Sequence, residues 1–186
     1  MALEFAQYYG HLGVKVSVIQ RSERLLPESD PEVGDTLSKV FREQGSEVFC
    51  GTQIQRVVKK GKKKSIEFLQ NGKKKSVEAE QILQALGREP DLEGLNLWTA
   101  GVKTEKGKVG IQATQQTNVP HIFAAGDLSG PYEIVHIAIQ QGEVAARNAA
   151  GLLAGKSEPM EESDYRLKLF AVFSDPEVAE IGRAHV

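Results

Sequence analysis

Two glycine-containing runs carry the residues with the clearest chemical potential. In the first run, the apolar residues Ile122 to Ala125 precede Gly126-Asp127. This pattern predicts a short buried strand that delivers Asp127 to its carboxyl end, where ligands bind in open α/β sheets. The carboxylate could accept a hydrogen bond from a ligand hydroxyl, and the N-terminus of the helix that follows would face an anionic group. A Gly-Asp pair alone would indicate only a turn.

The second run is Gln84-Ala85-Leu86-Gly87-Arg88-Glu89-Pro90, at the end of a strand predicted over Ile82 to Leu86. Gly87 has no side chain, so its backbone could approach a cofactor closely. Taken alone, the run indicates only a loop that contains Gly and Pro.

The elements that must position these runs alternate between helix and strand. The pattern predicts a helix over Ala2 to His11, a strand over Val14 to Ile19, a helix from Ser29-Asp30-Pro31 to Gly45, and a strand over Glu47 to Cys50. This order is typical of the βαβ units of a doubly wound parallel sheet. The sequence therefore predicts the α/β fold class.

The pattern becomes antiparallel between Gln53 and Glu80. The alternating runs Ser65 to Leu69 and Ser76 to Ala79 flank Asn71-Gly72, and both of these residues tolerate a positive φ. Further on, the pattern predicts a long helix from about Glu133 to Leu153.

On that long helix, Ile134, Ile137, Ala138 and Ala145 are expected to face inward. A polar, acidic linker from Gly155 to Asp164 follows the helix, and the pattern predicts a strand over Leu167 to Phe173.

Composition excludes several classes of function. The 186 residues hold 23 Lys and Arg against 25 Asp and Glu, a net charge of −2, so no whole-chain basic surface indicates a nucleic-acid partner. The lysine runs Lys59 to Lys64 and Lys73 to Lys75 favour a solvated surface that protects the sheet edge over an RNA-binding patch, since no Arg or aromatic residue interleaves them.

The chain also lacks an apolar run that could span a membrane and a recognisable leader, so we expect a cytoplasmic protein. Cys50 is the single cysteine, which excludes a CxxC pair within this chain. We interpret Cys50 as a small packing residue and expect no metal site.

Longer segments resemble a known family. The run from Thr117 to Asp127 is similar to the second FAD-binding fingerprint of the flavoproteins with two dinucleotide-binding domains, and Gln84 to Pro90 resembles the strand end that re-enters their FAD domain. Glu32 to Gly51, Pro131 to Gly142 and Phe173 to Ala179 resemble, in order, class I pyridine nucleotide–disulfide oxidoreductases of the dihydrolipoamide dehydrogenase and mercuric reductase kind.

The resemblance implies an FAD/NAD(P)-binding Rossmann-like fold, truncated at both ends, with the start of an α+β dimerisation domain. It assigns residues 1–84 to an NAD(P)-binding domain without its first strand and GxGxxG turn, and 85–155 to the returning segment of the FAD-binding domain. Residues 156–180 would be a linker and the first strand of the dimerisation domain. Residues 181–186 resemble a translated sequencing adapter, so we expect an assembly artefact there.

The resemblance also implies a reaction and its site residues. Electrons would pass between a nicotinamide, FAD and a disulfide or similar acceptor, with no catalytic residue inside this chain. Gly87, Gly126 and Asp127 would contact FAD, Val135 and His136 would run past its ring system, and Glu4 would lie near the nicotinamide.

Cofactor choice depends on the end of the second strand of such a domain, where an acid binds the ribose hydroxyls of NAD. Gln20 occupies that position and is followed by Arg21-Ser22, with Arg24 nearby. The missing carboxylate and the added guanidinium favour NADP over NAD.

The partners implied are a small-molecule or disulfide substrate and, in the full-length protein, a second copy in a homodimer. Two alternatives stay open: a related flavoprotein without a redox disulfide, such as a soluble transhydrogenase or an NADH oxidase, and a non-catalytic nucleotide-binding module.

Overall fold

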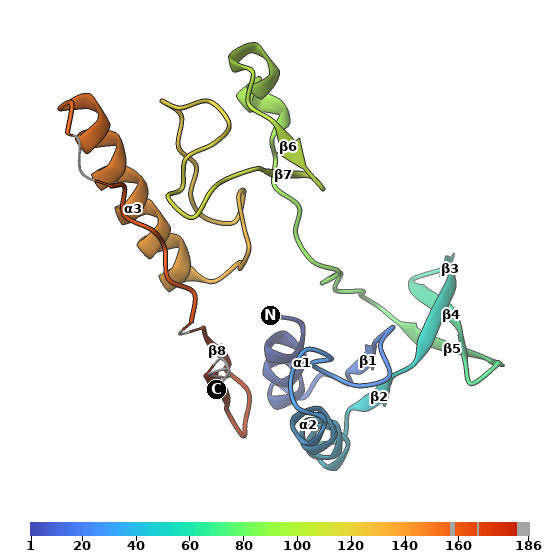
Figure 1. The fold of residues 1–186 in the computed structure, drawn as a ribbon. Coiled ribbons are helices and arrows are strands. Elements are labelled where there is room, and N and C mark those ends of the chain that lie inside the picture. The colour runs from blue at the N-terminus through green and yellow to red at the C-terminus, as the bar shows by residue number, and fades with distance from the viewer. Residues whose placement is uncertain (157–158, 167, 182–186) are drawn as a thin grey trace. The chain divides into compact units, whose positions relative to one another are not determined.

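The computed structural model describes residues 1–156, 159–166 and 168–181, which form two compact units (Figure 1). The first unit holds residues 1–86 and 171–180, and the second holds the described residues among 87–170 together with Ile181. Of the predicted artefact at residues 181–186, only Ile181 lies among the described residues. The domain boundaries implied by the resemblance stay predictions.

In the described part of the chain, no helix has the length and apolar character needed to cross a membrane.

The first unit begins with the alternation that the sequence predicts: α1 (Ala2–His11), β1 (Ser17–Ile19), α2 (Pro31–Glu43) and β2 (Glu47–Phe49). β1 and β2 pair in parallel, with Val18 opposite Val48. Both strands are shorter than predicted because each has only the other to pair with among the described residues. The βαβ arrangement itself is confirmed.

Helix α2 lies unusually close to the loop that precedes it. Gly34 is the reason, because a Cβ at this position would lie 2.2 Å from the carbonyl oxygen of Leu25. Leu37 and Phe41 on the same helix are each 1% exposed. They join the first unit's core, whose other apolar members are Leu3, Ala6, Leu25, Val48, Phe68 and Val172.

An antiparallel sheet completes the first unit, in the order β3 (Thr52–Lys60), β4 (Lys63–Gln70) and β5 (Lys73–Ala79). The predicted turn at Asn71-Gly72 joins β4 and β5 with φ of 50° and 72°, which confirms the hairpin. Buried Phe68 meets the ring of Phe49 edge-on at 5.3 Å and so packs this sheet against β2.

Two predicted strands are wrong for this structure. Residues 82–86 form no strand, and Leu83 and Leu86 are 56% and 81% exposed, because no described strand lies beside them to accept their backbone hydrogen bonds. Residues 122–125 instead bond to their own loop. Ala124 donates its N–H to the carbonyl of Gln115, and a single bridge joins Gln116 and Phe123.

The second unit contains short elements and one long helix: the 3-10 turns η1 (Glu93–Leu95) and η2 (Leu97–Ala100), β6 (Thr104–Glu105), β7 (Lys108–Val109) and α3 (Val135–Leu153). The long helix is confirmed, and Ile137 faces inward as predicted. The inward face is less apolar than predicted, however. Gln141 and Asn148 are buried on it beside Ile137 and Val144, while Ile134, Ala138 and Ala145 are only half-buried.

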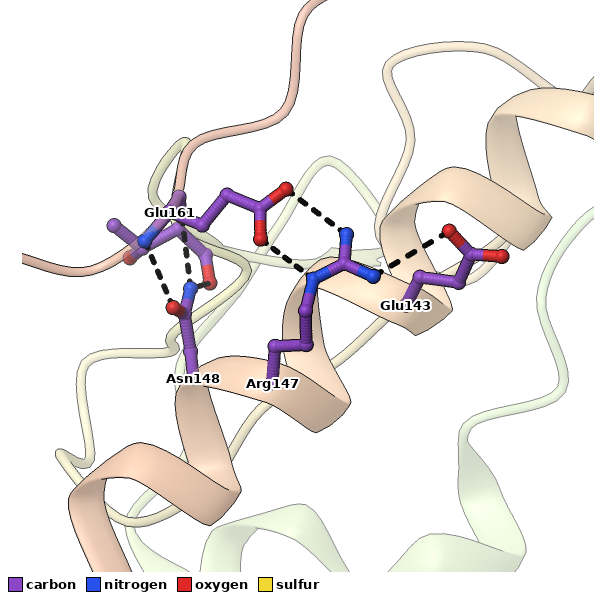
Figure 2. A network of polar contacts seen from close by, with 5 residues as sticks. Glu143, Arg147, Asn148 and Glu161 are labelled. Atoms are coloured by element: carbon purple, nitrogen blue, oxygen red, sulfur yellow. Dashed lines mark hydrogen bonds and ion pairs between the residues drawn. The ribbon is translucent and has the colours of Figure 1, made fainter.

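The predicted linker is fastened to α3. The Asn148 side chain donates to the Glu161 carbonyl and accepts the Glu161 N–H, each at 2.8 Å (Figure 2). Arg147 donates two hydrogen bonds to the Glu161 carboxylate, at 2.6 and 2.9 Å. The N–H of Ser163 donates to the carbonyl of Ala113. We call residues 159–166 the docked segment, since these bonds hold it on the second unit.

Beyond the docked segment, β8 (Leu169–Val172) pairs with β9 (Val178–Ile181). β8 lies within the strand predicted over residues 167–173.

We predict opposite effects for two glycine substitutions within helices. Gly34→Ala forces its new methyl group against the Leu25 carbonyl and should lower the free energy of unfolding by about 1–3 kcal/mol. Gly142→Ala in α3 meets open space and should raise it by about 0.5–1 kcal/mol, since alanine loses less backbone entropy in a helix. Urea unfolding of the two variants checks this, and equal effects at both sites would contradict it.

We also predict an acid-sensitive contact at the docked segment. Hydrogen bonding from Arg147 lowers the pKa of Glu161 below its ordinary value. The contact therefore stabilises the folded chain fully at pH values above the ordinary glutamate pKa. This stabilisation is lost as the pH falls through the lowered pKa of Glu161. Arg147→Gln should move the NMR titration midpoint of Glu161 upward, whereas Glu162→Gln should leave it in place.

Candidate functional site

The first group of predicted site residues lies where β1 ends. The N–H of Gln20 donates to the Phe49 carbonyl at 2.8 Å. Its own carbonyl accepts bonds from both the N–H and the hydroxyl of Thr52, at 3.1 and 2.9 Å. The backbone of Gln20 is thus fixed on both sides, while its half-buried side chain forms no hydrogen bond within the described residues.

Two arginines follow this fixed point. Arg21 and Arg24 are exposed, and neither forms an ion pair or a hydrogen bond within the part of the chain that the structure describes. The intervening Glu23 carboxylate faces Gly51, so closely that a Cβ on Gly51 would lie 2.7 Å from one of its oxygens. The end of β1 therefore presents two free guanidinium groups beside an uncharged Gln20, an arrangement suited to a phosphate.

Cys50 lies beside this group of residues, half-buried at the end of β2. Burial raises the pKa of its thiol, an effect that the nearby Arg42 opposes and Glu23 reinforces. The protonated thiol is a poor nucleophile, which agrees with a packing role.

Glu4 lies on α1 and contacts the chain near β8. Its carboxylate pairs with the amino group of Met1 and accepts the N–H of Phe173 at 3.1 Å. Hydrogen bonding from the Met1 amino group lowers the pKa of Glu4. Burial opposes this effect by a smaller amount, and the Phe173 N–H lowers the pKa further. Gln7, one turn further along, bonds the backbone N–H and carbonyl of Asp175 at 2.6 and 2.7 Å. The predicted position of Glu4 near a nicotinamide stays a prediction.

The second group of predicted residues centres on the turn from Gly126 to Gly130. Gly126 has a φ of +85°, and its carbonyl accepts the backbone N–H groups of Ser129 and Gly130, at 3.0 and 3.2 Å. Asp127 projects from this turn with its side chain 48% exposed, and its nearest cation is Arg88 at 3.6 Å. The carboxylate is therefore accessible and only loosely paired.

Arg88 lies between two acidic groups, because it also reaches Glu133 at 3.8 Å, and Lys108 binds Glu133 at 3.1 Å. Gly87 just before it has a φ of +107°, which favours glycine. Among the described residues no atom lies within 4 Å of a Cβ built on Gly87. The approach to a cofactor predicted at Gly87 stays a prediction, and the backbone angle by itself favours glycine at this position.

Val135 and His136 occupy the first turn of α3, and both are exposed. Ile134 is the N-cap residue and offers no side-chain hydrogen bond to the turn, so no capping side chain satisfies the first N–H groups of α3. Such a helix end favours an anion.

The site residues predicted from the sequence did not include the polar side chain that holds the Gly126–Gly130 turn. Gln141 accepts the N–H of Gly126 at 2.7 Å, donates to the carbonyl of Gly130 at 2.6 Å, and donates to the hydroxyl of Tyr165 at 2.9 Å. A signal was present: Gln141 and Asn148 fall at helical spacing inside the stripe formed by Ile137 and Val144. Within the described residues, no group of three or more metal-binding side chains gathers.

Comparison with known proteins identifies the family. The profile described as "Pyridine nucleotide-disulphide oxidoreductase" matches residues 1–142. The chain is 38% identical to a mercuric reductase of Staphylococcus aureus and 33% identical to a dihydrolipoyl dehydrogenase of Mycobacterium leprae. Each match covers 98% of this chain, but only 32% and 38%, respectively, of the relative.

Comparison with solved structures supports the same family assignment. The crystal structure of LpdA from Mycobacterium tuberculosis matches with a TM-score of 0.82 and 26% identity, over 97% of this chain and 38% of that one. The flavoprotein disulfide reductase RclA of Escherichia coli matches with a TM-score of 0.79 at 21% identity, over 97% of this chain and 40% of its own, which supports the fold alone.

The two units thus have the FAD/NAD(P)-binding fold expected from the resemblance, over part of its length. Because the family profile covers residues 1–142 and the solved structures cover nearly all of the chain, this protein belongs to the pyridine nucleotide-disulphide oxidoreductase family.

Proposed function

We propose that this chain supplies two nucleotide-binding surfaces to an FAD-dependent NAD(P)H oxidoreductase that passes electrons between a nicotinamide, FAD and a disulfide or similar acceptor. The observation that carries the proposal is the accessible Asp127 carboxylate on a fixed turn of a chain that belongs to this family. The chain spans 28% to 38% of the first curated relatives it matches, so the activity is proposed for the whole protein.

The residues of the second unit fit FAD. Asp127 can accept hydrogen bonds from ribityl hydroxyls because, within the described residues, Arg88 at 3.6 Å is the only ion-pair partner of its carboxylate. The N–H groups at Val135 and His136, which no capping side chain satisfies, favour a negatively charged or electron-rich group. When bound, FAD supplies the transfer of electron pairs between a nicotinamide and an acceptor. The protein's part is to bind and orient it.

The residues of the first unit fit the 2′-phosphate of NADP. Arg21 can donate two parallel hydrogen bonds to phosphate oxygens, and Arg24 adds positive charge. Gln20 removes the repulsion that a carboxylate would exert there. We therefore propose NADP as the preferred nicotinamide cofactor, with NAD as the weaker one.

The relatives' names include mercuric reductase and dihydrolipoyl dehydrogenase, which suggests an acceptor that reacts with thiols. A homodimer and a cytoplasmic location stay predictions of the sequence. A related flavoprotein without a redox disulfide is the alternative, and the two differ in whether the reduced enzyme exposes thiols to an alkylating reagent.

We predict that Asp127→Ala in the full-length protein weakens FAD binding about 10–100-fold, since a hydrogen bond to a charged group contributes about 1.5–3 kcal/mol. Asp127→Asn, which keeps one acceptor oxygen, should lose less. Flavin fluorescence during titration of the apoprotein measures the affinity. Asp91→Ala is the control, because Asp91 lies on an exposed loop and forms no ion pair within the described residues. Unchanged FAD affinity in Asp127→Ala would remove the main support for the proposal.

We predict a second effect on cofactor choice. Arg21→Ala should weaken NADPH binding at least about tenfold and leave NADH binding nearly unchanged, because only NADPH carries the 2′-phosphate. Gln20→Glu should shift preference toward NADH, since a carboxylate repels phosphate and can accept ribose hydroxyls. Calorimetric titrations with both nucleotides measure this. A wild type that binds the two equally, with Arg21→Ala affecting neither, would contradict the NADP assignment.

A further inference from the structure

The Gly126–Gly130 turn is closed by one side chain from α3. Gln141 is fully buried and contacts both ends of the turn, accepting the first N–H and donating to the last carbonyl. Both of its amide hydrogens are used, one on Gly130 and one on Tyr165. Because the donors and acceptors are buried, losing either bond would leave an unsatisfied polar group.

Asp127 depends on this arrangement for its position. It lies inside the bridged turn, and within the described residues its carboxylate contacts only one cation, Arg88 at 3.6 Å. The bonds from Ser129 and Gly130 to the Gly126 carbonyl fix the turn's shape, while Gln141 fixes the turn on α3. The position of the Asp127 carboxylate therefore depends on the position of the Gln141 side-chain amide.

The docked segment also holds the Gln141 side chain in place. The Tyr165 hydroxyl accepts from Gln141 at 2.9 Å and from Gln115 at 3.0 Å, and Gln115 also reaches the Ser163 hydroxyl at 2.9 Å. The ring of Tyr165 packs edge-on against Tyr132 at 5.9 Å. Gln115 is fully buried with a φ of +65°, which these contacts maintain. The Glu161 contacts of Figure 2 fasten the same segment further along α3.

We propose that Gln141 is a positioning residue for the flavin site, and that Tyr165 of the docked segment holds its amide in place. The inference rests on the proposed function, since it takes Asp127 to be a ligand of FAD. The chain that leads toward β8 would then act on FAD affinity without touching the cofactor. This couples the docking of residues 159–166 to the geometry of the Asp127 carboxylate.

The test uses the full-length flavoprotein with three variants and two matched controls. Gln141→Ala removes all three bonds, Gln141→Glu keeps the acceptor for Gly126 but loses both donors, and Tyr165→Phe removes only the hydroxyl. Gln140→Ala and Tyr132→Phe are the controls, because neither side chain forms a hydrogen bond within the described residues. The readouts are FAD affinity, NADPH affinity, and hydrogen exchange of the peptide that covers residues 124–131 in the apoprotein.

We expect Gln141→Ala to weaken FAD binding at least tenfold and to speed exchange in residues 124–131. Gln141→Glu sets an acceptor oxygen against the Gly130 carbonyl in a buried site, so it should weaken FAD binding at least as much as Gln141→Ala. Tyr165→Phe should fall between Gln141→Ala and the wild type. NADPH affinity should stay within about twofold, because the Arg21 region belongs to the first unit. A general loss of structure would instead change both affinities, and circular dichroism would detect it. If Gln141→Ala does not fold, Tyr165→Phe decides, because it removes one hydrogen bond of Gln141 and buries no new polar group.

Two negative results are separable. If the wild type binds FAD, Asp127→Ala weakens that binding and the Gln141 and Tyr165 variants do not, the positioning role is overturned while the proposed function stands. If Asp127→Ala leaves FAD binding unchanged, the proposed function loses its main support and the flavin part of this inference fails with it. Exchange in residues 124–131 that stays unchanged in Gln141→Ala would overturn the inference in either case.

Discussion

The second unit depends on the burial of polar side chains at the centre of its one long helix. Gln141 replaces backbone partners for Gly126 and Gly130, much as Asn148 does for Glu161. Each amide offers a donor and an acceptor in one plane, so it can pair with a peptide group that has no strand beside it. In a buried setting such bonds are costly to break, and they select one arrangement of the loops around α3.

The first unit achieves the same result with backbone pairing. Phe49 of β2 accepts the N–H of Gln20, and Thr52 of β3 donates to its carbonyl. Gly34 allows the loop that holds Leu25 to lie against α2. The side chains of Arg21 and Arg24 form no ion pair or hydrogen bond within the described residues, since other groups hold their segment. In both units a fixed main chain carries exposed charged groups, an arrangement that suits the binding of a charged nucleotide.

Sequence patterns predicted the elements that are stabilised locally. Helices α1, α2 and α3 and the hairpin at Asn71-Gly72 follow from periodicity, proline and glycine positions, and turn chemistry, all of which act within a few residues. The strands predicted at 82–86 and 122–125 failed for the opposite reason. A strand exists only beside a partner, and in the described chain these apolar residues have none that forms a ladder with them.

The sequence by itself determined the family and the residue types at both sites, because the order of its motifs and its charged residues is visible in one dimension. Asp127, Gln20 and Arg21 could be named from it. Only the tertiary structure decided how they are held, that Asp127 is loosely paired while Arg21 is free, and that the predicted linker is docked on α3. The physical reason is the separation of the contacting residues along the sequence: Gln141 and Tyr165 are 24 residues apart, and Gln115 and Tyr165 are 50 apart. A contact between polar residues so far apart leaves no periodicity in the sequence, and folding alone brings them within hydrogen-bonding distance.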